Sequence, residues 1–258
     1  MAAKAKSITT ILFDMDGTVM NRVDMAFQLG KIYGLIGTNG AGKSTVINLI
    51  SGAARPTAGS ILLRGTHIEG LPPHRIARLG VARTFQNLRL FGGFTVLDNV
   101  VTARQSKRRV HLPQILLSTP GCRRTEETLR REALAFLCQV KLEDYADRRA
   151  DSLSYGLQRR LEIARCLALE PALLLLDEPA AGMNPQESFQ LSEDIRAIHQ
   201  AKPEMTIILI EHDMKVVMGL CEYIYTMASG KCIAAGTPEE VQASEDVVRA
   251  YLGGRHHA

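Results

Sequence analysis

Eight consecutive residues near the amino end have the types and spacing of a phosphate-binding loop. They match the pattern G-x-x-x-x-G-K-[ST] at each fixed position, and they are Gly37, Thr38, Asn39, Gly40, Ala41, Gly42, Lys43 and Ser44. Glycine lets backbone N–H groups wrap closely around a polyphosphate, and a helix expected from Lys43 adds the positive end of its dipole. We expect Lys43 to reach the β- and γ-phosphates, Ser44 to ligate Mg²⁺, and Thr45 to complete the nucleotide-binding set. A Gly-rich turn that matches by accident is the alternative.

Two adjacent carboxylates follow an apolar run farther along the chain. Leu173 to Leu176 have the pattern of a buried strand, and Asp177 and Glu178 come directly after it. A carboxylate at the end of such a strand can hold Mg²⁺ through water, so Asp177 is a candidate metal ligand. The alternative is an ordinary acidic turn before Pro179.

Three other segments indicate little when each is taken alone. Ser154, Tyr155 and Gly156 precede a run with helical spacing, where a serine can cap the helix and an anion can bind. A plain helix cap is the simpler interpretation of that segment. Gln86 and His212 each follow an expected strand, and a lone histidine at such a place is usually structural.

The order of these motifs resembles that of the ATPase subunits of ABC transporters, over the chain from about Asn21 to Gly254. The resemblance implies that the chain binds ATP with Mg²⁺ and hydrolyses the ATP. In that family the residue at Glu178 is the general base that polarises the attacking water. The residue at His212 contacts the γ-phosphate.

The same resemblance implies a metal set and a second ATPase subunit. Gln86 would touch Mg²⁺ or the attacking water and couple to a membrane subunit. The implied metal set is Ser44, Gln86 and Asp177. The segment Ser154, Tyr155 and Gly156, called the signature segment below, would close on the ATP of the second subunit, in a homodimer or a heterodimer.

The chain departs from the family's usual signature, Leu-Ser-Gly-Gly-Gln. Tyr155 replaces the first glycine and Leu157 replaces the glutamine, whereas Ser154 and Gly156 are kept. Asn184 stands where many relatives have aspartate. We expect such departures to tune hydrolysis or communication between subunits.

Finer features resemble one branch of the family, the ATP-binding subunits of branched-chain amino acid importers. They are the segments Arg83–Phe91, Glu178–Pro185, Glu211–Met214 and Ala235–Glu240. The resemblance implies a peripheral protein at the cytoplasmic face of the inner membrane. Its partners would be two transmembrane permease subunits and, indirectly, an extracytoplasmic solute-binding protein. An importer ATPase for urea or amides is an alternative, and so is a module that holds ATP without turnover.

The amino end carries a rival motif. Residues Ile11 to Thr18 resemble the first motif of haloacid-dehalogenase-type phosphatases, in which Asp14 would be the nucleophile and Asp16 the acid and base. That fold needs a further Ser or Thr, a Lys and an acidic pair, for which the sequence offers no convincing set. ABC subunits usually place an aromatic residue here to stack on adenine, and Phe13 is the candidate.

Composition limits the class of protein. The chain has 258 residues, 46% of them apolar, and a formal net charge of +4, which does not itself imply a nucleic-acid partner. No apolar run approaches the ~20 residues that a membrane-spanning helix needs. The five cysteines include no Cys-x-x-Cys pair, which favours a reduced protein without structural zinc.

The motifs need an alternation of strands and helices to position them. We expect strands at residues 7–13, 23–28, 31–36, 60–63, 81–85, 172–176, 206–210, 223–227 and 232–235. Helical spacing covers 43–50, 74–79, 95–103, 124–140, 157–169, 185–200 and 213–220, and a linker is expected at Pro113–Gly121. With the resemblance, this predicts a single α/β P-loop NTPase domain (RecA-like) over residues 1–258. Its mostly parallel core would be 1–86 and 161–258, with an antiparallel β subdomain and a helical subdomain inserted at about 87–160.

Overall fold

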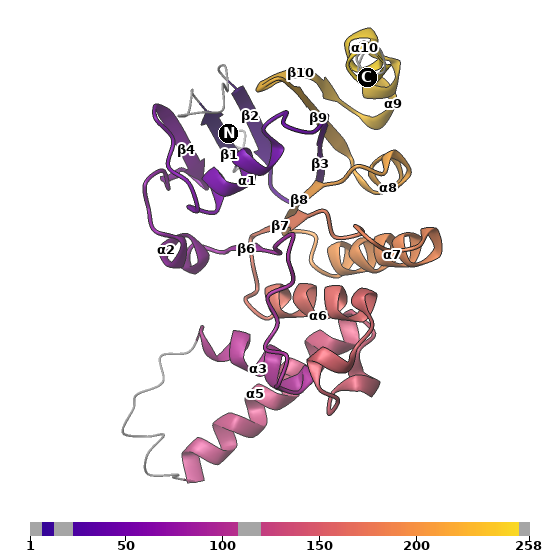
Figure 1. Ribbon diagram of the computed structural model, residues 1–258. Coiled ribbons are helices and arrows are strands. Elements are labelled where there is room, and N and C mark those ends of the chain that lie inside the picture. Colours follow the sequence, from indigo (N-terminus) through magenta and orange to yellow (C-terminus); the bar gives the residue numbers. More distant parts are fainter. Residues whose placement is uncertain (1–6, 13–22, 108–119, 253–258) are drawn as a thin grey trace. The chain divides into compact units, whose positions relative to one another are not determined.

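The structure is a computed structural model that describes residues 7–12, 23–107 and 120–252 (Figure 1). The described residues form two compact units. Of these residues, the first unit contains 7–12, 23–83, 172–179 and 199–252, and the second contains 84–107, 120–171 and 180–198. Each unit is described by itself.

A six-stranded sheet forms the centre of the first unit. In spatial order its strands are β10 (Lys231–Gly236), β9 (Tyr223–Ala228), β3 (Ile32–Gly37), β8 (Thr206–Ile210), β7 (Leu173–Asp177) and β6 (Val81–Arg83). All neighbours are parallel except β10 and β9. Every residue of β3, β7 and β8 is buried, as expected for parallel strands covered on both faces.

A second, antiparallel sheet belongs to the same unit. Its strands are β2 (Val23–Gln28), β1 (Ser7–Leu12), β4 (Gly59–Leu63) and β5 (Thr66–His67). Residues of β2 alternate between buried and exposed, so one face of this strand packs on the core. A single hydrophobic cluster contains buried residues of β2, β4, β3, β7, β8 and β9 together with the apolar residues of α1 (Lys43–Ile50).

The remaining helices of the first unit are short. They are α2 (Pro73–Arg78), α8 (Met214–Leu220), α9 (Pro238–Ala243) and α10 (Glu245–Leu252). Helix α9 begins with a capping box, in which Thr237 accepts a hydrogen bond from the Glu240 N–H and the Glu240 carboxylate accepts one from the Thr237 N–H. Asp213 caps α8 by accepting from the N–H of Lys215, which fixes where that helix starts.

The second unit is helical in its described residues. It contains α3 (Val96–Gln105), α5 (Pro120–Gln139), α6 (Tyr155–Leu167) and residues 185–198 of α7 (Pro185–Ala201). Two 3₁₀ turns, η1 (Glu143–Tyr145) and η2 (Ala150–Ser152), connect α5 to α6. Helix α3 packs on both α5 and α6, and buried apolar side chains line these helices, among them Val100, Leu137 and Leu161.

The expected fold class is confirmed: a mostly parallel sheet with an antiparallel sheet and a helical part. The described residues of the segment expected to be inserted, 87–160, belong to the second unit, which also contains 161–171 and 180–198. The expected strand over residues 81–85 ends at Arg83, because the N–H and C=O of Phe85 bond to side chains of α6 instead of to a neighbouring strand. Strand β5 and helices α9 and α10 were not expected. Within the described ranges, no helix is long and apolar enough to cross a bilayer.

Candidate nucleotide site

The phosphate loop (Gly37–Ser44) connects β3 to α1 and depends on glycine at defined places. Gly37 has φ 150° and lies so close to β9 that a Cβ there would stand 2.1 Å from the carbonyl oxygen of Met227. Gly40 has φ 75°, yet nothing lies within 4 Å of its position for a Cβ. Gly37 is therefore required by close packing, whereas Gly40 is required only by backbone conformation and leaves its side of the loop open.

This contrast predicts different costs for two alanine substitutions in the nucleotide-free chain. Gly37→Ala should lower the free energy of unfolding by about 3 kcal/mol, because a backbone carbonyl must move aside. Gly40→Ala should cost about 1–2 kcal/mol, the conformational strain alone. Chemical denaturation of both variants measures the difference. Equal losses would show that the approach of Gly37 to Met227 does not constrain the loop.

The ammonium group of Lys43 is held inside the loop by its own backbone. Its Nζ donates to the carbonyl oxygens of Gly37 at 2.8 Å and Thr38 at 3.0 Å, and the residue is 6% exposed. Burial lowers the pKa of Lys43, while the charges of Glu178 and Asp177 oppose that shift. A cation is thus placed at the loop before any anion binds, with two carboxylates nearby.

The amino end of α1 can accept an anion. Gly42 occupies the cap position with φ 100°, and no side chain caps the helix. The first-turn N–H groups and the helix dipole therefore favour a negative group at this end. Asn39, Gly40 and Ser44 are exposed, while Thr38 and Thr45 are half-buried. The predicted loop residues thus form one continuous turn of chain around the buried Lys43.

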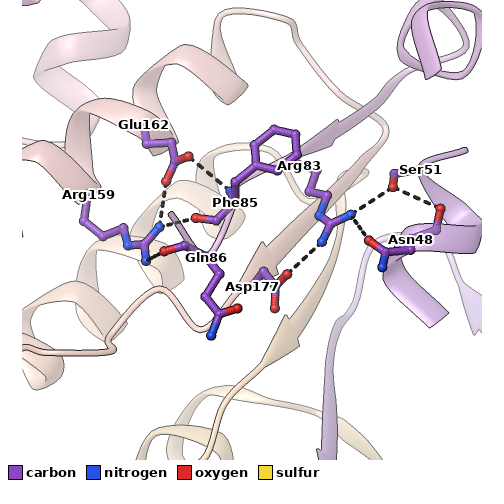
Figure 2. A network of polar contacts seen from close by, with 8 residues as sticks. All are labelled: Asn48, Ser51, Arg83, Phe85, Gln86, Arg159, Glu162 and Asp177. Carbon is purple, nitrogen blue, oxygen red and sulfur yellow. Dashed lines mark hydrogen bonds and ion pairs between the residues drawn. The ribbon is translucent and has the colours of Figure 1, made fainter. Parts of the chain in front are cut away.

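Asp177 ends β7 beside an arginine that the sequence did not single out as a site residue. Arg83 Nη2 donates to Asp177 Oδ2 at 2.8 Å, and both side chains are largely buried. Arg83 Nη1 also donates to Asn48 Oδ1 at 2.6 Å and to Ser51 Oγ at 3.2 Å on α1 and its carboxyl end (Figure 2). Arg83 therefore connects the carboxylate at the end of β7 with the helix that follows the phosphate loop.

Glu178 and His212 lie in direct contact in the first unit. His212 Nε2 and Glu178 Oε1 are 2.6 Å apart, and the Glu178 N–H donates to the Ile210 carbonyl at 3.0 Å. Glu178 has φ 49°, a left-handed conformation that is costly for a residue with a side chain. The side chain of Glu178 is 17% exposed and that of His212 is 47% exposed. The arrangement offers a partly buried carboxylate with a hydrogen-bonding partner, as a general base requires.

The signature segment begins α6 in the second unit. Ser154 stands at the cap position, but its exposed side chain makes no capping hydrogen bond, contrary to the simpler interpretation. The ring of Tyr155 lies beside Gly182, and its hydroxyl accepts from Arg159 at 3.1 Å. Gly156 faces Glu187 and Met183 at ordinary contact distances. The amino end of α6 is thus left without a side-chain cap.

Two further predicted positions lie in the second unit. Gln86 is exposed, and its backbone carbonyl accepts from Arg159 Nη2 at 2.8 Å. Asn184 Oδ1 accepts from the Glu187 N–H at 2.9 Å, and Glu187 Oε2 accepts from the Asn184 N–H at 3.0 Å. This reciprocal pair starts α7, a task that asparagine and aspartate perform equally well.

Some expectations are not addressed by these contacts. Phe13, Asp14 and Asp16 lie outside the described residues. Among residues 7–12, 23–107 and 120–252, no group of three or more His, Cys, Asp or Glu side chains could hold a metal ion by itself.

Comparison with known proteins agrees with this geometry. The model of the family described as ABC transporter matches residues 20–181, and that of the branched-chain amino acid ATP-binding cassette transporter matches 231–257. The high-affinity branched-chain amino acid transport ATP-binding protein LivG of Escherichia coli K12 is 44% identical over 98% of this chain and 99% of its own length. The corresponding protein BraF of Pseudomonas aeruginosa is 44% identical over 91% of each chain.

Solved structures give the same result for the fold. A nucleotide-free ATP-binding cassette from an ABC transporter has a TM-score of 0.80 and 26% identity, covering 95% of this chain and 98% of its own. A cassette in the ADP conformation has a TM-score of 0.81 and 27% identity, covering 97% and 100%. The chain therefore belongs to the ABC transporter family of ATP-binding cassettes.

Proposed function

We propose that the chain hydrolyses ATP to drive the uptake of branched-chain or related amino acids through separate membrane subunits. The contact between Glu178 and His212 carries the hydrolytic part of this proposal, because a module that only holds ATP needs no general base. Similarity at 44% identity to LivG and BraF, along nearly the whole chain, supports the class of cargo.

The residues of the first unit divide the work on ATP. Backbone N–H groups of the phosphate loop and the ammonium of Lys43 bind the phosphates and set the γ-phosphorus in place. The Glu178 carboxylate orients a water molecule and takes its proton. His212 donates from Nε2 to that carboxylate or to the γ-phosphate. Glu178 Oε1 is 2.6 Å from His212 Nε2, so the attacking water would be bound beside this contact.

The donor set fits Mg²⁺ that arrives with the nucleotide. Such Mg²⁺ neutralises charge on the β- and γ-phosphates and is usually held by one or two carboxylates, phosphate oxygens and water. We propose that Ser44, which is exposed in the first turn of α1, and Asp177, 4% exposed at the end of β7, hold it, with Gln86 as the third protein ligand. Arg83 holds the Asp177 carboxylate in place through their 2.8 Å contact.

The signature segment supports a pair of ATPase subunits. Because the exposed side chain of Ser154 makes no capping hydrogen bond to its own helix, it can bind an anion at the amino end of α6. We propose that this anion is the γ-phosphate of ATP bound to a second subunit. Two permease subunits, and a solute-binding protein acting through them, complete the proposed importer at the cytoplasmic face of the inner membrane.

An uptake assay tests the class of cargo. In the organism that encodes this chain, a Lys43→Ala allele should abolish uptake of radiolabelled leucine while urea uptake stays normal. The same allele with a wild-type copy supplied in trans should recover leucine uptake. Loss of urea or amide uptake with normal leucine uptake would contradict the proposed cargo and would favour urea or amides instead.

A further inference from the structure

Arg159 and Glu162 form an ion pair inside the second unit, one turn apart on α6. Arg159 Nη1 and Glu162 Oε2 are 2.8 Å apart, and the two side chains are 0% and 5% exposed. A charged pair withdrawn from water in this way is weak evidence of stabilisation, because desolvation opposes the attraction. The other groups to which the two side chains bond therefore explain the pair better than its own attraction does.

Both side chains bond to the backbone at Phe85 and Gln86. Arg159 donates to the carbonyl oxygens of Phe85 and, at 2.8 Å, of Gln86, while Glu162 Oε1 accepts from the Phe85 N–H at 3.1 Å (Figure 2). Three polar groups of the main chain, at two adjacent residues, are thus bonded to one helix. In the figure the guanidinium and the carboxylate both point at this stretch of main chain.

The pair also reaches the signature segment. Arg159 Nη2 donates to the Tyr155 hydroxyl at 3.1 Å, within the first turns of α6. The Nε of Arg159 has no hydrogen-bond partner among the described residues, although it is buried. A buried donor without a partner lowers the stability of the fold. The guanidinium is therefore oriented to bond the carbonyl groups and Tyr155, although its Nε is left without a partner.

The position of Gln86 in the chain shows why the tether matters. Strand β6 ends at Arg83 in the first unit, and residues from Thr84 onward belong to the second unit. Within the second unit, the backbone of Gln86 is fixed by the same helix whose first residues are the signature segment. Movement of α6 must carry Gln86 with it or break three hydrogen bonds.

We infer that Arg159 and Glu162 are positioning residues that make Gln86 and the signature segment move as one body. This inference deepens the proposed function and rests on it for its catalytic consequence. Gln86 reaches its working position only when α6 does, so engagement of the signature segment with nucleotide sets the position of a residue proposed to act on Mg²⁺ or water.

Hydrogen exchange tests the tether without relying on ATP hydrolysis. In full-length Arg159→Met, exchange protection of the peptide around residues 84–88 should fall about tenfold or more, while α6 keeps its protection. Arg104→Met is the matched control, because Arg104 is a partly buried arginine of this unit with two carboxylate partners, Glu132 and Glu170, and a carbonyl partner, Ala168. The control should leave residues 84–88 unchanged.

Kinetics test the consequence for catalysis. Arg159→Met should lower kcat for ATP by about 10- to 100-fold with little change in KM, because the nucleotide-binding loop lies in the other unit. In a Gln86→Ala background the same change should have little further effect, since the residue acts through Gln86. If Arg159→Met does not fold, Arg159→Lys retains the charge but not the planar fork that reaches two carbonyls, and the same loss of kcat is expected.

The outcomes separate the two claims. Unchanged protection of residues 84–88, losses that multiply independently with Gln86→Ala, or an equal loss of kcat in Arg104→Met would each overturn the positioning role. Absence of ATP hydrolysis by the wild-type chain, with protection falling as expected, would overturn the proposed function and leave the tether standing.

Discussion

Glu178→Gln is expected to stop ATP turnover and to preserve ATP binding. The amide oxygen can still accept a hydrogen bond from His212 Nε2, so the local geometry at 2.6 Å survives. An amide cannot take a proton from water, so kcat should fall by about 10²- to 10⁴-fold, the usual contribution of a general base. Steady-state phosphate release and equilibrium binding of ATP measure the two effects separately.

Glu193→Gln is the matched control for this change. It makes the same replacement of a carboxylate by an amide, on the exposed side of α7, where Glu193 pairs with Arg196. This variant should hydrolyse ATP at the wild-type rate. A Glu178→Gln variant that turns over as fast as the control would show that Glu178 is not the base.

Lys43→Ala is expected to act on binding itself. The ammonium of Lys43 is already held at 2.8 Å from the Gly37 carbonyl and needs little rearrangement to meet a phosphate. Removing a charged hydrogen-bond donor from this loop should weaken ATP binding by about 100-fold. Titration with a fluorescent ATP analogue measures the dissociation constant.

Lys231→Ala provides the comparison for Lys43→Ala. Lys231 is an exposed lysine at the start of β10 in the same unit, so its loss changes the net charge equally without touching the loop. Its dissociation constant for ATP should match the wild type. Normal ATP affinity in Lys43→Ala would remove the basis for assigning the loop to phosphate binding.

The phosphate loop and the strand ends of the site could be predicted from the sequence because each is encoded by a contiguous run of residues. The phosphate loop is a contiguous motif between a buried strand and a helix, and the structure places its residues in one turn around Lys43. The continuous apolar runs of β7 and β8 likewise predict parallel strands that end at one edge of a sheet. Asp177 and His212 could be predicted as site residues because they lie at or just after the ends of those strands.

The contacts between distant segments could not be predicted in the same way. Arg83 meets Asp177 across 94 positions, and Arg159 meets the backbone of Phe85 across 74. The spacing of polar and apolar residues does not indicate which backbone carbonyl a buried arginine will bond. In the sequence, Arg159 looks like any other polar residue of an amphipathic helix. The early end of β6 has the same cause, since side chains of α6 take the place of a strand neighbour at Phe85.

The state of the nucleotide after incubation with the protein tests the central claim most directly. Wild-type chain and Glu178→Gln would each be mixed with MgATP in less than stoichiometric amount, quenched at intervals, and the nucleotide analysed as ATP or ADP. The proposed function predicts that the wild type converts the nucleotide to ADP and phosphate, whereas Glu178→Gln retains it bound as ATP. Conversion to ADP at the same rate in both proteins, or no conversion by the wild type, would contradict hydrolysis at this site.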